Sequence, residues 1–525
     1  MHSTEIVLAL VALGTVGAAF ANKLRVPPPS LLVLAGVLVG LIPGVPAVRV
    51  TPQVVSFVVL PPLLWAATGD LAGRDLRAVW RPVAVLAVGL VVASAGAVAA
   101  VLSAVAAVPL AMAFVLGAVL ASTDPVAVSA LGRRLSLPPR VQALVQAESL
   151  FNDATSLVLF QIAVSFAVGS SVAAGWGGAL WHGVVQFVVL AGGGALTGGV
   201  IGAAVIAVRG RITDPVLESV VALVAPYAAY VAGEQLRVSG VTAVIVAGLL
   251  VGARRTRITT PSTRLHVDAV YQTVIFLLES VVFSLIGLEL PTLVRDLAHT
   301  GSWPLTALAI AATLIAVRAL WVFPLWAARQ RRQRERRSSW TVPAIVSWAG
   351  TRGVVPLAAA LSIPLTTAQG MPLARRDLLL VLAVTVIVIS LITQGMTLEP
   401  LVRRTAIAQM PAGGRSEEAT ARLRMAEAGI ARLDELATGE EVPGAVLDRI
   451  RQSLSSRAGH ARTQLEGSLI HESDLTEIDV RRDVITAQGA ELDRLYAAGT
   501  ITAATCLRLQ HALDLEHTRY SDDAG

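Results

Sequence analysis

The chain has 525 residues, of which 54% are hydrophobic and only 15% are charged. A soluble protein of this length needs far more charge on its surface, so the composition excludes a soluble globular protein and indicates an all-α polytopic membrane protein. The net charge of +6 comes mostly from arginines between apolar runs, and no basic patch interleaved with aromatic residues points to nucleic acid as a partner.

Apolar segments long enough to cross a lipid bilayer recur along residues 1–402. We expect about thirteen transmembrane helices, each needing roughly 20 apolar residues. The first is expected to be retained rather than removed as a signal peptide, because no Lys or Arg precedes it. The predicted helix centres are Leu10, Leu38, Leu60, Val92, Leu120, Leu157, Leu196, Ala225, Val246, Phe283, Thr313, Val355 and Ile387.

Arginine is unevenly divided between the loops. Alternate loops carry clusters, such as Arg74, Arg77 and Arg81 or the run from Arg329 to Arg337, whereas the intervening loops carry few. Positively charged loops stay on the cytoplasmic side of a membrane. The pattern therefore predicts a multi-pass protein of the plasma membrane, with the N-terminus outside and the C-terminus in the cytoplasm.

The composition changes after Pro400, where the apolar segments stop. Residues 403–525 are charged and polar, and helical spacing of apolar residues appears at Ser416–Leu436 and Pro443–Leu454. We predict a transmembrane domain at 1–402 and a cytoplasmic helical tail at 403–525. The tail is expected to be regulatory, to bind a regulator or to support a dimer; the alternative is a solvated stalk without a specific role.

Two of the predicted spans contain helix-breaking residues near their middle. The fifth contains the sequence STDP at Ser122–Pro125, and the twelfth contains GTRG at Gly350–Gly353 followed by Pro356. Proline and glycine favour unwinding at these points, and unwound backbone at membrane depth is tolerated only where protein buries it or it lines a cavity. If spans 1–6 and 8–13 form an inverted repeat, both breaks fall in the fifth helix of their repeat, which is typical of a secondary transporter site. The alternative is two unrelated proline kinks.

The sixth span carries ionisable residues, each of which costs about 2.5–3.5 kcal/mol or more at membrane depth. Glu148 and Asn152 lie four residues apart on one helix face, and Ser149 and Asp153 lie on the adjoining face. We assign Arg352 as the ion-pair partner of Glu148, because a guanidinium matches a carboxylate. This structural ion pair leaves Asp153 as the carboxylate that exchanges protons.

Oxygen atoms near Asp153 are suited to a hard alkali cation such as sodium. The predicted metal ligands are the Asp153 carboxylate, the Ser149 hydroxyl, and the hydroxyl or carbonyl of Thr123. Asp124 is either a further ligand or a cap on a half-helix, and Asn152 is expected to tie the sixth helix to Thr123. No His or Cys nearby indicates a transition metal, and we expect no cofactor beyond the transported sodium ion and proton.

Glu279 in the tenth span and Arg318 in the eleventh are two further charges at membrane depth. They lie in consecutive antiparallel spans and are predicted to form a second ion pair, since a lone buried charge is far costlier than a paired one. A role in the ion pathway is the alternative.

Three ordered motifs identify a family resemblance. The segments Ser122–Val128, Glu148–Phe160 and Gly350–Pro364 resemble the monovalent cation:proton antiporter family, in particular the bacterial sodium/proton antiporters related to the eukaryotic sodium/proton exchangers. Leu60–Trp65 and Val282–Leu290 are similar to further segments of that family. The similarity covers the membrane part of the chain.

The resemblance implies a thirteen-helix inverted-repeat fold, with a dimerisation domain, a mobile core domain, homodimer assembly and elevator-like alternating access. It also implies that Asp153 binds the cation and the proton, that Thr123 and Asp124 lie at the helix crossing, and that Arg352 bonds to Glu148. Ala66 stands where many relatives carry an acidic residue, which leaves ion selectivity and affinity open.

The expected activity is secondary active exchange of sodium or lithium for protons, and not enzymatic catalysis. Relatives with an Asn-Asp pair tend to exchange one cation for one proton, and a single titratable Asp153 agrees with electroneutral exchange. A potassium/proton antiporter is the alternative. More remote alternatives are a cation channel and an intramembrane hydrolase that uses Asp124 and Asp153.

Overall fold

The computed structural model describes residues 28–42, 52–69, 80–124, 139–168, 176–212, 214–259, 261–296, 302–333, 340–367, 369–404, 413–437, 444–465, 487–488, 490–492 and 494. Within these ranges the chain is nearly all helical, with one isolated β-bridge between Thr366 and Pro372. The chain forms two compact units, Met1–Met410 and Pro411–Gly525, which are described separately.

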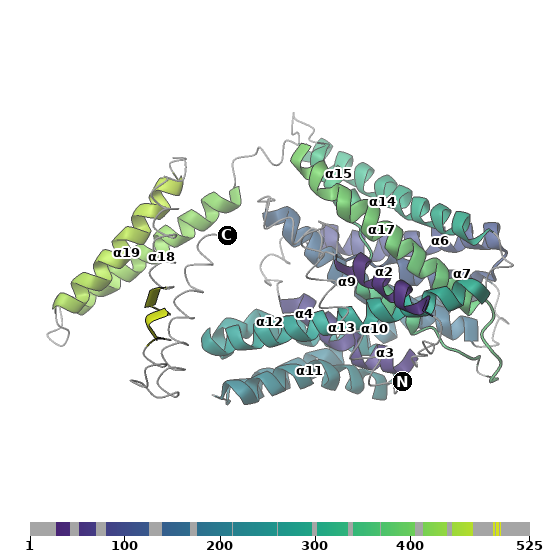
Figure 1. Cartoon of the computed structure of the whole chain (residues 1–525), viewed down its shortest axis with the longest axis horizontal. Helices are drawn as coiled ribbons and strands as arrows, with labels where there is room; N and C mark the ends of the chain where they lie inside the picture. Colours follow the sequence, from purple (N-terminus) through teal and green to yellow (C-terminus); the bar gives the residue numbers. More distant parts are fainter. Residues whose placement is uncertain are drawn as a thin grey trace. The chain divides into compact units, whose positions relative to one another are not determined.

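The first unit contains helices α2 to α17, most of which are labelled in Figure 1. They are α2 (Pro28–Gly40), α3 (Pro52–Val58), α4 (Leu60–Gly69), the π-helical segment η1 (Val85–Leu90), α6 (Val91–Ala106), α7 (Leu110–Ala121), α9 (Pro139–Val168), α10 (Trp176–Arg209), α11 (Pro215–Gln235), α12 (Gly240–Ile258), α13 (Pro261–Asp296), α14 (Trp303–Gln333), α15 (Thr341–Trp348), α16 (Val354–Leu361) and α17 (Arg376–Arg404). Every predicted centre lies within one of these helices except Leu10, which is outside the described residues.

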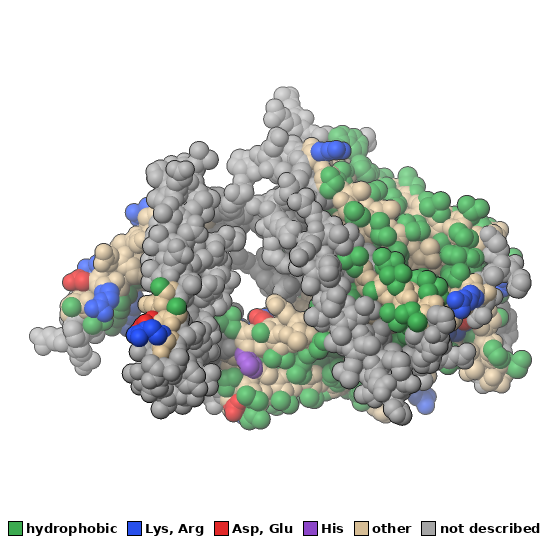
Figure 2. Space-filling view, viewed as in Figure 1, with side chains coloured by type: hydrophobic (Ala, Val, Ile, Leu, Met, Phe, Trp, Pro, Cys, Tyr) green, Lys and Arg blue, Asp and Glu red, His purple; other side chains and the backbone are tan. Residues whose placement is uncertain are grey.

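The surface of this unit is apolar, as expected for a protein in lipid. Among the described residues, 8 helical stretches are long and apolar enough to cross a membrane, and Leu31–Gly40 and Leu110–Ala121 are shorter apolar helices. Leu196 and Val200 on α10 are 76% and 70% exposed, and Figure 2 shows hydrophobic side chains spread over the surface near α14 and α17. Exposed apolar side chains on long helices are stable only against lipid or protein. The chain is therefore a multi-pass membrane protein.

The predicted break in the twelfth span is present, and the helix of the fifth span ends at the predicted position. Helix α7 ends at Ala121, and Ser122 is extended, with φ −65° and ψ 143°. Helix α15 ends at Trp348 and α16 begins at Val354, which leaves the predicted Gly-rich segment outside any helix. The part of the fifth span that follows Asp124 lies outside the described residues.

Glycines bring several of the helices into close backbone contact. A Cβ atom on Gly36 of α2 would lie 2.2 Å from the carbonyl oxygen of Ser284 on α13. A Cβ atom on Gly198 of α10 would likewise lie 2.3 Å from the carbonyl oxygen of Ala243 on α12. Small residues allow such close approach between membrane helices. These contacts hold α2 to α13 and α10 to α12.

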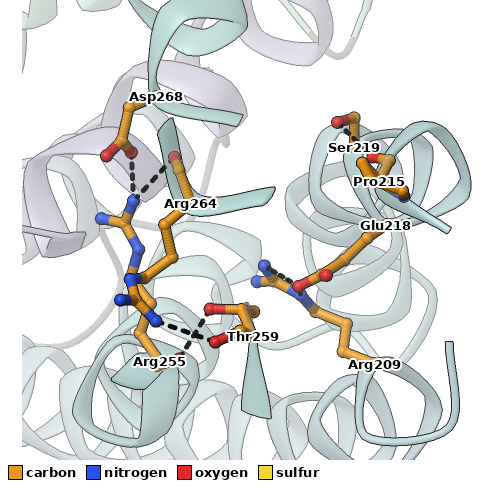
Figure 3. A network of polar contacts seen from close by, with 8 residues as sticks. All are labelled: Arg209, Pro215, Glu218, Ser219, Arg255, Thr259, Arg264 and Asp268. Atoms are coloured by element: carbon orange, nitrogen blue, oxygen red, sulfur yellow. Dashed lines mark hydrogen bonds and ion pairs between the residues drawn. The ribbon is translucent and has the colours of Figure 1, made fainter. Parts of the chain in front are cut away.

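A polar network joins helices α10 to α13 near the turns between them (Figure 3). Arg209, the last residue of α10, donates to Glu218 of α11 from Nε at 3.0 Å and from Nη2 at 2.7 Å. The side chains of this pair are only 5% and 3% exposed, whereas the Arg255–Asp268 pair is more open to solvent. These arginines come from the arginine-rich loops, so part of the positive charge fixes helix ends.

The second unit contains α18 (Gly413–Ala437) and α19 (Gly444–Leu465), which pack against each other. A Cβ atom on Gly429 would lie 3.0 Å from a methyl carbon of Leu454, and Arg462 forms an ion pair with Glu427 at 3.3 Å. Both predicted helical segments of the tail lie in these two helices, apart from Pro443, which is outside the described residues.

Candidate functional site

The residues that follow α7 meet the segment between α15 and α16 through their backbones. The N–H of Asp124 donates to the carbonyl oxygen of Thr351 at 2.7 Å, and the Thr351 hydroxyl donates to the carbonyl oxygen of Asp124 at 2.8 Å. Peptide groups that leave a helix at membrane depth need other partners. Each break therefore supplies partners for the other, although 227 residues separate them in the chain.

Asp153 lies beside this crossing and is buried, with 6% of its surface exposed. Its Oδ1 atom accepts a hydrogen bond from the hydroxyl of Ser122. The Ser149 hydroxyl, one helical turn earlier on α9, donates to the carbonyl oxygen of Thr123. The structure thus gathers the oxygens predicted as sodium ligands and adds the Ser122 hydroxyl, which the sequence analysis did not assign.

Asn152 makes the predicted link between α9 and the end of α7. Its Nδ2 atom donates to Thr123 Oγ1 at 3.2 Å, and its Oδ1 atom is buried without a hydrogen-bond partner among the described residues. An amide oxygen left in this way is a further acceptor close to the break.

Asp124 is partly buried, and its carboxylate lies against the backbone of Gly353. A Cβ atom on Gly353 would be 1.5 Å from Asp124 Oδ2, so a larger residue here would displace the Asp124 side chain. Gly353 directly precedes the first residue of α16. A carboxylate near a helix N-terminus is favoured by the helix dipole, and the two roles predicted for Asp124, ligand and cap, both stay open.

The buried ion pair at this site differs from the predicted one. Glu148 is paired with Arg318 of α14, whose Nη1 and Nη2 atoms donate to its two carboxylate oxygens at 2.7 and 3.0 Å. Arg352 instead donates from Nε to the carbonyl oxygen of Leu120 at 3.2 Å and from Nη1 to that of Gly350 at 2.7 Å. The predicted Glu148–Arg352 pair is therefore wrong, because the unwound backbone around Arg352 offers carbonyl acceptors and α14 places a second arginine at Glu148.

The predicted pair of Glu279 with Arg318 is wrong for the same reason. Arg318 is committed to Glu148, and its Nε atom donates to the carbonyl oxygen of Val346 at 3.1 Å. Glu279 is partly buried on α13.

Comparison with known proteins agrees with this architecture. A family model described as sodium/hydrogen exchanger, transmembrane, matches residues 6–404. The chain belongs to this family. An uncharacterized Na⁺/H⁺ exchanger of Mycobacterium tuberculosis is 33% identical, over 99% of this chain and 96% of that protein. The Na⁺/H⁺ antiporter ApNhaP of Aphanothece halophytica is 31% identical, over 73% of this chain and 70% of that protein.

The fold of this exchanger is also similar to a solved structure. The sodium proton antiporter MjNhaP1 from Methanocaldococcus jannaschii, determined at pH 8, matches with a TM-score of 0.63 and 20% sequence identity. The match covers 78% of this exchanger and 98% of that chain. The helical fold of the membrane unit is therefore that of this antiporter.

Other polar groups of the exchanger were missed by sequence reasoning. The N–H of Arg352 donates to the hydroxyl of Ser390, which in turn donates to Gln394 on the same helix, α17. The signal that could have located them is a buried polar pair at four-residue spacing in an otherwise apolar span. Ala66, on α4, is partly buried and packs against the apolar core.

Proposed function

We propose that this exchanger carries out antiport in which Asp153 alternately binds a proton and a sodium or lithium ion. One observation carries the proposal: the buried Asp153 carboxylate lies with the oxygens of Ser122, Ser149 and Thr123 at the crossing of two interrupted helices. Carboxylate, hydroxyl and carbonyl oxygens at unwound helices are the ligands by which membrane transporters hold sodium. Membership of the sodium/hydrogen exchanger family supports the same function.

Cation binding requires two hydroxyl groups to turn. The protons of Ser122 and Ser149 point at Asp153 and at the Thr123 carbonyl, respectively. A hydroxyl can rotate so that a lone pair faces the cation, which frees both acceptor oxygens for it. A proton on Asp153 removes the charge that holds the cation. Sodium and protons therefore compete for one group.

Glu148 does not take part in this competition, because Arg318 neutralises it inside the protein. With Asp153 as the exchanging carboxylate, one cation replaces one proton and the cycle is electroneutral. An empty carboxylate is costly to carry across a low-dielectric barrier, so return without a proton is suppressed.

We further propose alternating access in a thirteen-helix inverted repeat centred on α10, with a core domain moving against a dimerisation domain. The interruptions of α7 and of α15–α16, at corresponding positions of two halves, support this arrangement. We propose that the protein is a homodimer in the plasma membrane, with its N-terminus outside. We propose that the helical tail is cytoplasmic and regulatory, and that it can bind a regulator.

The decisive experiment compares Asp153→Asn with the parent protein in proteoliposomes. Asparagine keeps the size of the side chain but cannot exchange a proton, so sodium-dependent proton flux is expected to fall to the background of empty liposomes. Asp377→Asn is the matched control, because Asp377 has a side chain 55% exposed at the start of α17. Flux of Asp153→Asn at the parent rate would disprove the site. Sodium, lithium and potassium gradients measured in parallel identify the transported ion.

A further inference from the structure

The interrupted segment between α15 and α16 leaves backbone groups that need partners outside its own helices. The carbonyl oxygen of Thr351 is used by Asp124, and that of Gly350 is used by the Arg352 side chain. A third backbone group, the N–H of Arg352, donates to the hydroxyl oxygen of Ser390 at 3.2 Å. Helix α17 thus holds the backbone of Arg352, whose side chain donates to the carbonyl oxygen of Leu120 in α7.

The hydroxyl of Ser390 is oriented in an unusual way for a membrane helix. Serine and threonine commonly donate to the carbonyl oxygen four residues earlier, as Thr393 does with Ile389 on the same helix. Ser390 instead donates forward to Gln394 Oε1 at 2.6 Å. Its single proton is therefore used, and a lone pair is fixed toward the N–H of Arg352.

Within the described ranges, the side chain of Gln394 makes no hydrogen bond other than the one with Ser390. The residue is 1% exposed, and its Nε2 atom is buried without a partner among the described residues. An unpaired amide in an apolar interior is unfavourable, and leucine or methionine would fill the same space without that penalty. The contact that Gln394 does make is the one that orients Ser390.

A continuous chain of contacts runs from this pair to the candidate cation site. The Arg352 guanidinium donates to the carbonyl oxygen of Leu120, which lies in the last turn of α7. Two residues later, Ser122 donates to Asp153. We propose that Ser390 and Gln394 are positioning residues for the cation site, a role that rests on the proposed antiport at Asp153. They fix the Arg352 backbone, and Arg352 then fixes the end of α7 that contacts the Asp153 carboxylate.

The test uses the full-length protein in proteoliposomes, with sodium as the probe. Ser390→Ala removes the acceptor of the Arg352 N–H, and Gln394→Met removes the group that orients it while keeping the side-chain length. Losing one such contact is expected to raise the KM for sodium about fivefold, with kcat changed less than about twofold. Ser390→Thr keeps the hydroxyl and is expected to restore the parent KM. Thr393→Val is the matched control, because Thr393 is exposed and bonds only within its own helix.

Two further measurements separate positioning from a general loss of stability. Because the two side chains act as one unit, the double variant with Ser390→Ala and Gln394→Met is expected to have the same KM as Ser390→Ala alone. In detergent, sodium stabilises the folded state by an amount that rises with the ratio of its concentration to its Kd, so the same sodium concentration should raise the Tm of Ser390→Ala less than that of the parent.

The proposal is overturned if both single variants keep the parent KM for sodium, even where their yield of protein is lower. It is also overturned if the effects of the two substitutions on KM add in the double variant. Asp153→Asn is measured alongside. If it abolishes flux while Ser390→Ala keeps the parent KM, the positioning role fails and the antiport at Asp153 stands. If Asp153→Asn retains flux, the proposed function itself fails.

Discussion

The buried pair of Glu148 and Arg318 gives a quantitative prediction about stability. Replacing Arg318 with methionine leaves the Glu148 carboxylate, only 1% exposed, without its cation. Breaking a buried ion pair from one side costs about 3–5 kcal/mol, and the lost hydrogen bond to the Val346 carbonyl adds about 1 kcal/mol. We therefore expect Arg318→Met to lower the free energy of unfolding by about 4–6 kcal/mol.

The matched test is a double-mutant cycle. Combining Arg318→Met with Glu148→Gln leaves two uncharged side chains of similar size, so the double variant is expected to regain about 3 kcal/mol relative to the sum of the single variants. Unfolding is followed by tryptophan fluorescence during titration with sodium dodecyl sulfate. The same cycle with Arg352→Met is expected to give a smaller coupling energy, because Arg352 donates to backbone carbonyls. A larger coupling of Glu148 to Arg352 than to Arg318 would refute the pairing seen in the structure.

Two further predictions concern the crossing and the movement around it. Gly353→Ala places a methyl carbon on the Asp124 carboxylate. Because a displacement of about 1 Å at a reacting site can cost a large factor in rate, sodium-dependent flux is expected to fall more than tenfold. In the control Gly96→Ala, the new methyl group meets nothing within 4 Å, so flux should be unchanged. The hydroxyl oxygens of Ser56 on α3 and Ser362 after α16 lie 2.8 Å apart. With cysteines at these two positions and the single native cysteine replaced by serine, oxidation should join α3 to the end of α16 and stop exchange, and reduction should restore it. Transport that continues at the parent rate through a fully formed cross-link would argue against movement between these elements.

Hydropathy and breaker residues located most of the membrane helices correctly. These features can be located because they depend only on short stretches of sequence. A helix in lipid must make all its backbone hydrogen bonds internally and expose apolar side chains along its whole length. The interruptions after Ala121 and Trp348 follow from proline and glycine in the same local way. The hydrogen bond from Asn152 to Thr123 was also predicted, since the positions of both helices were already constrained.

The errors concern pairing between distant helices. Arg318 and Arg352 are both arginines at membrane depth, and nothing local to either residue states which of them faces Glu148. Which arginine pairs with Glu148 depends on how α14 and the interrupted α15–α16 pack against α9, and sequence spacing does not encode that packing. Ser390 and Gln394 were missed for a related reason, because their acceptor role appears only once the unwound Arg352 backbone is placed beside α17.

The sequence by itself determined that this protein spans the membrane many times, where the helices of the fifth and twelfth spans end, and which carboxylate lies beside those ends. The tertiary structure alone decided that Arg318 neutralises Glu148 and that Arg352 donates to the carbonyl oxygens of Leu120 and Gly350. The physical reason is that hydrophobic segments and helix breaks are properties of short stretches of chain. Ion pairs inside a membrane protein are instead set by the packing of helices that lie more than a hundred residues apart, such as the 170 residues between Glu148 and Arg318.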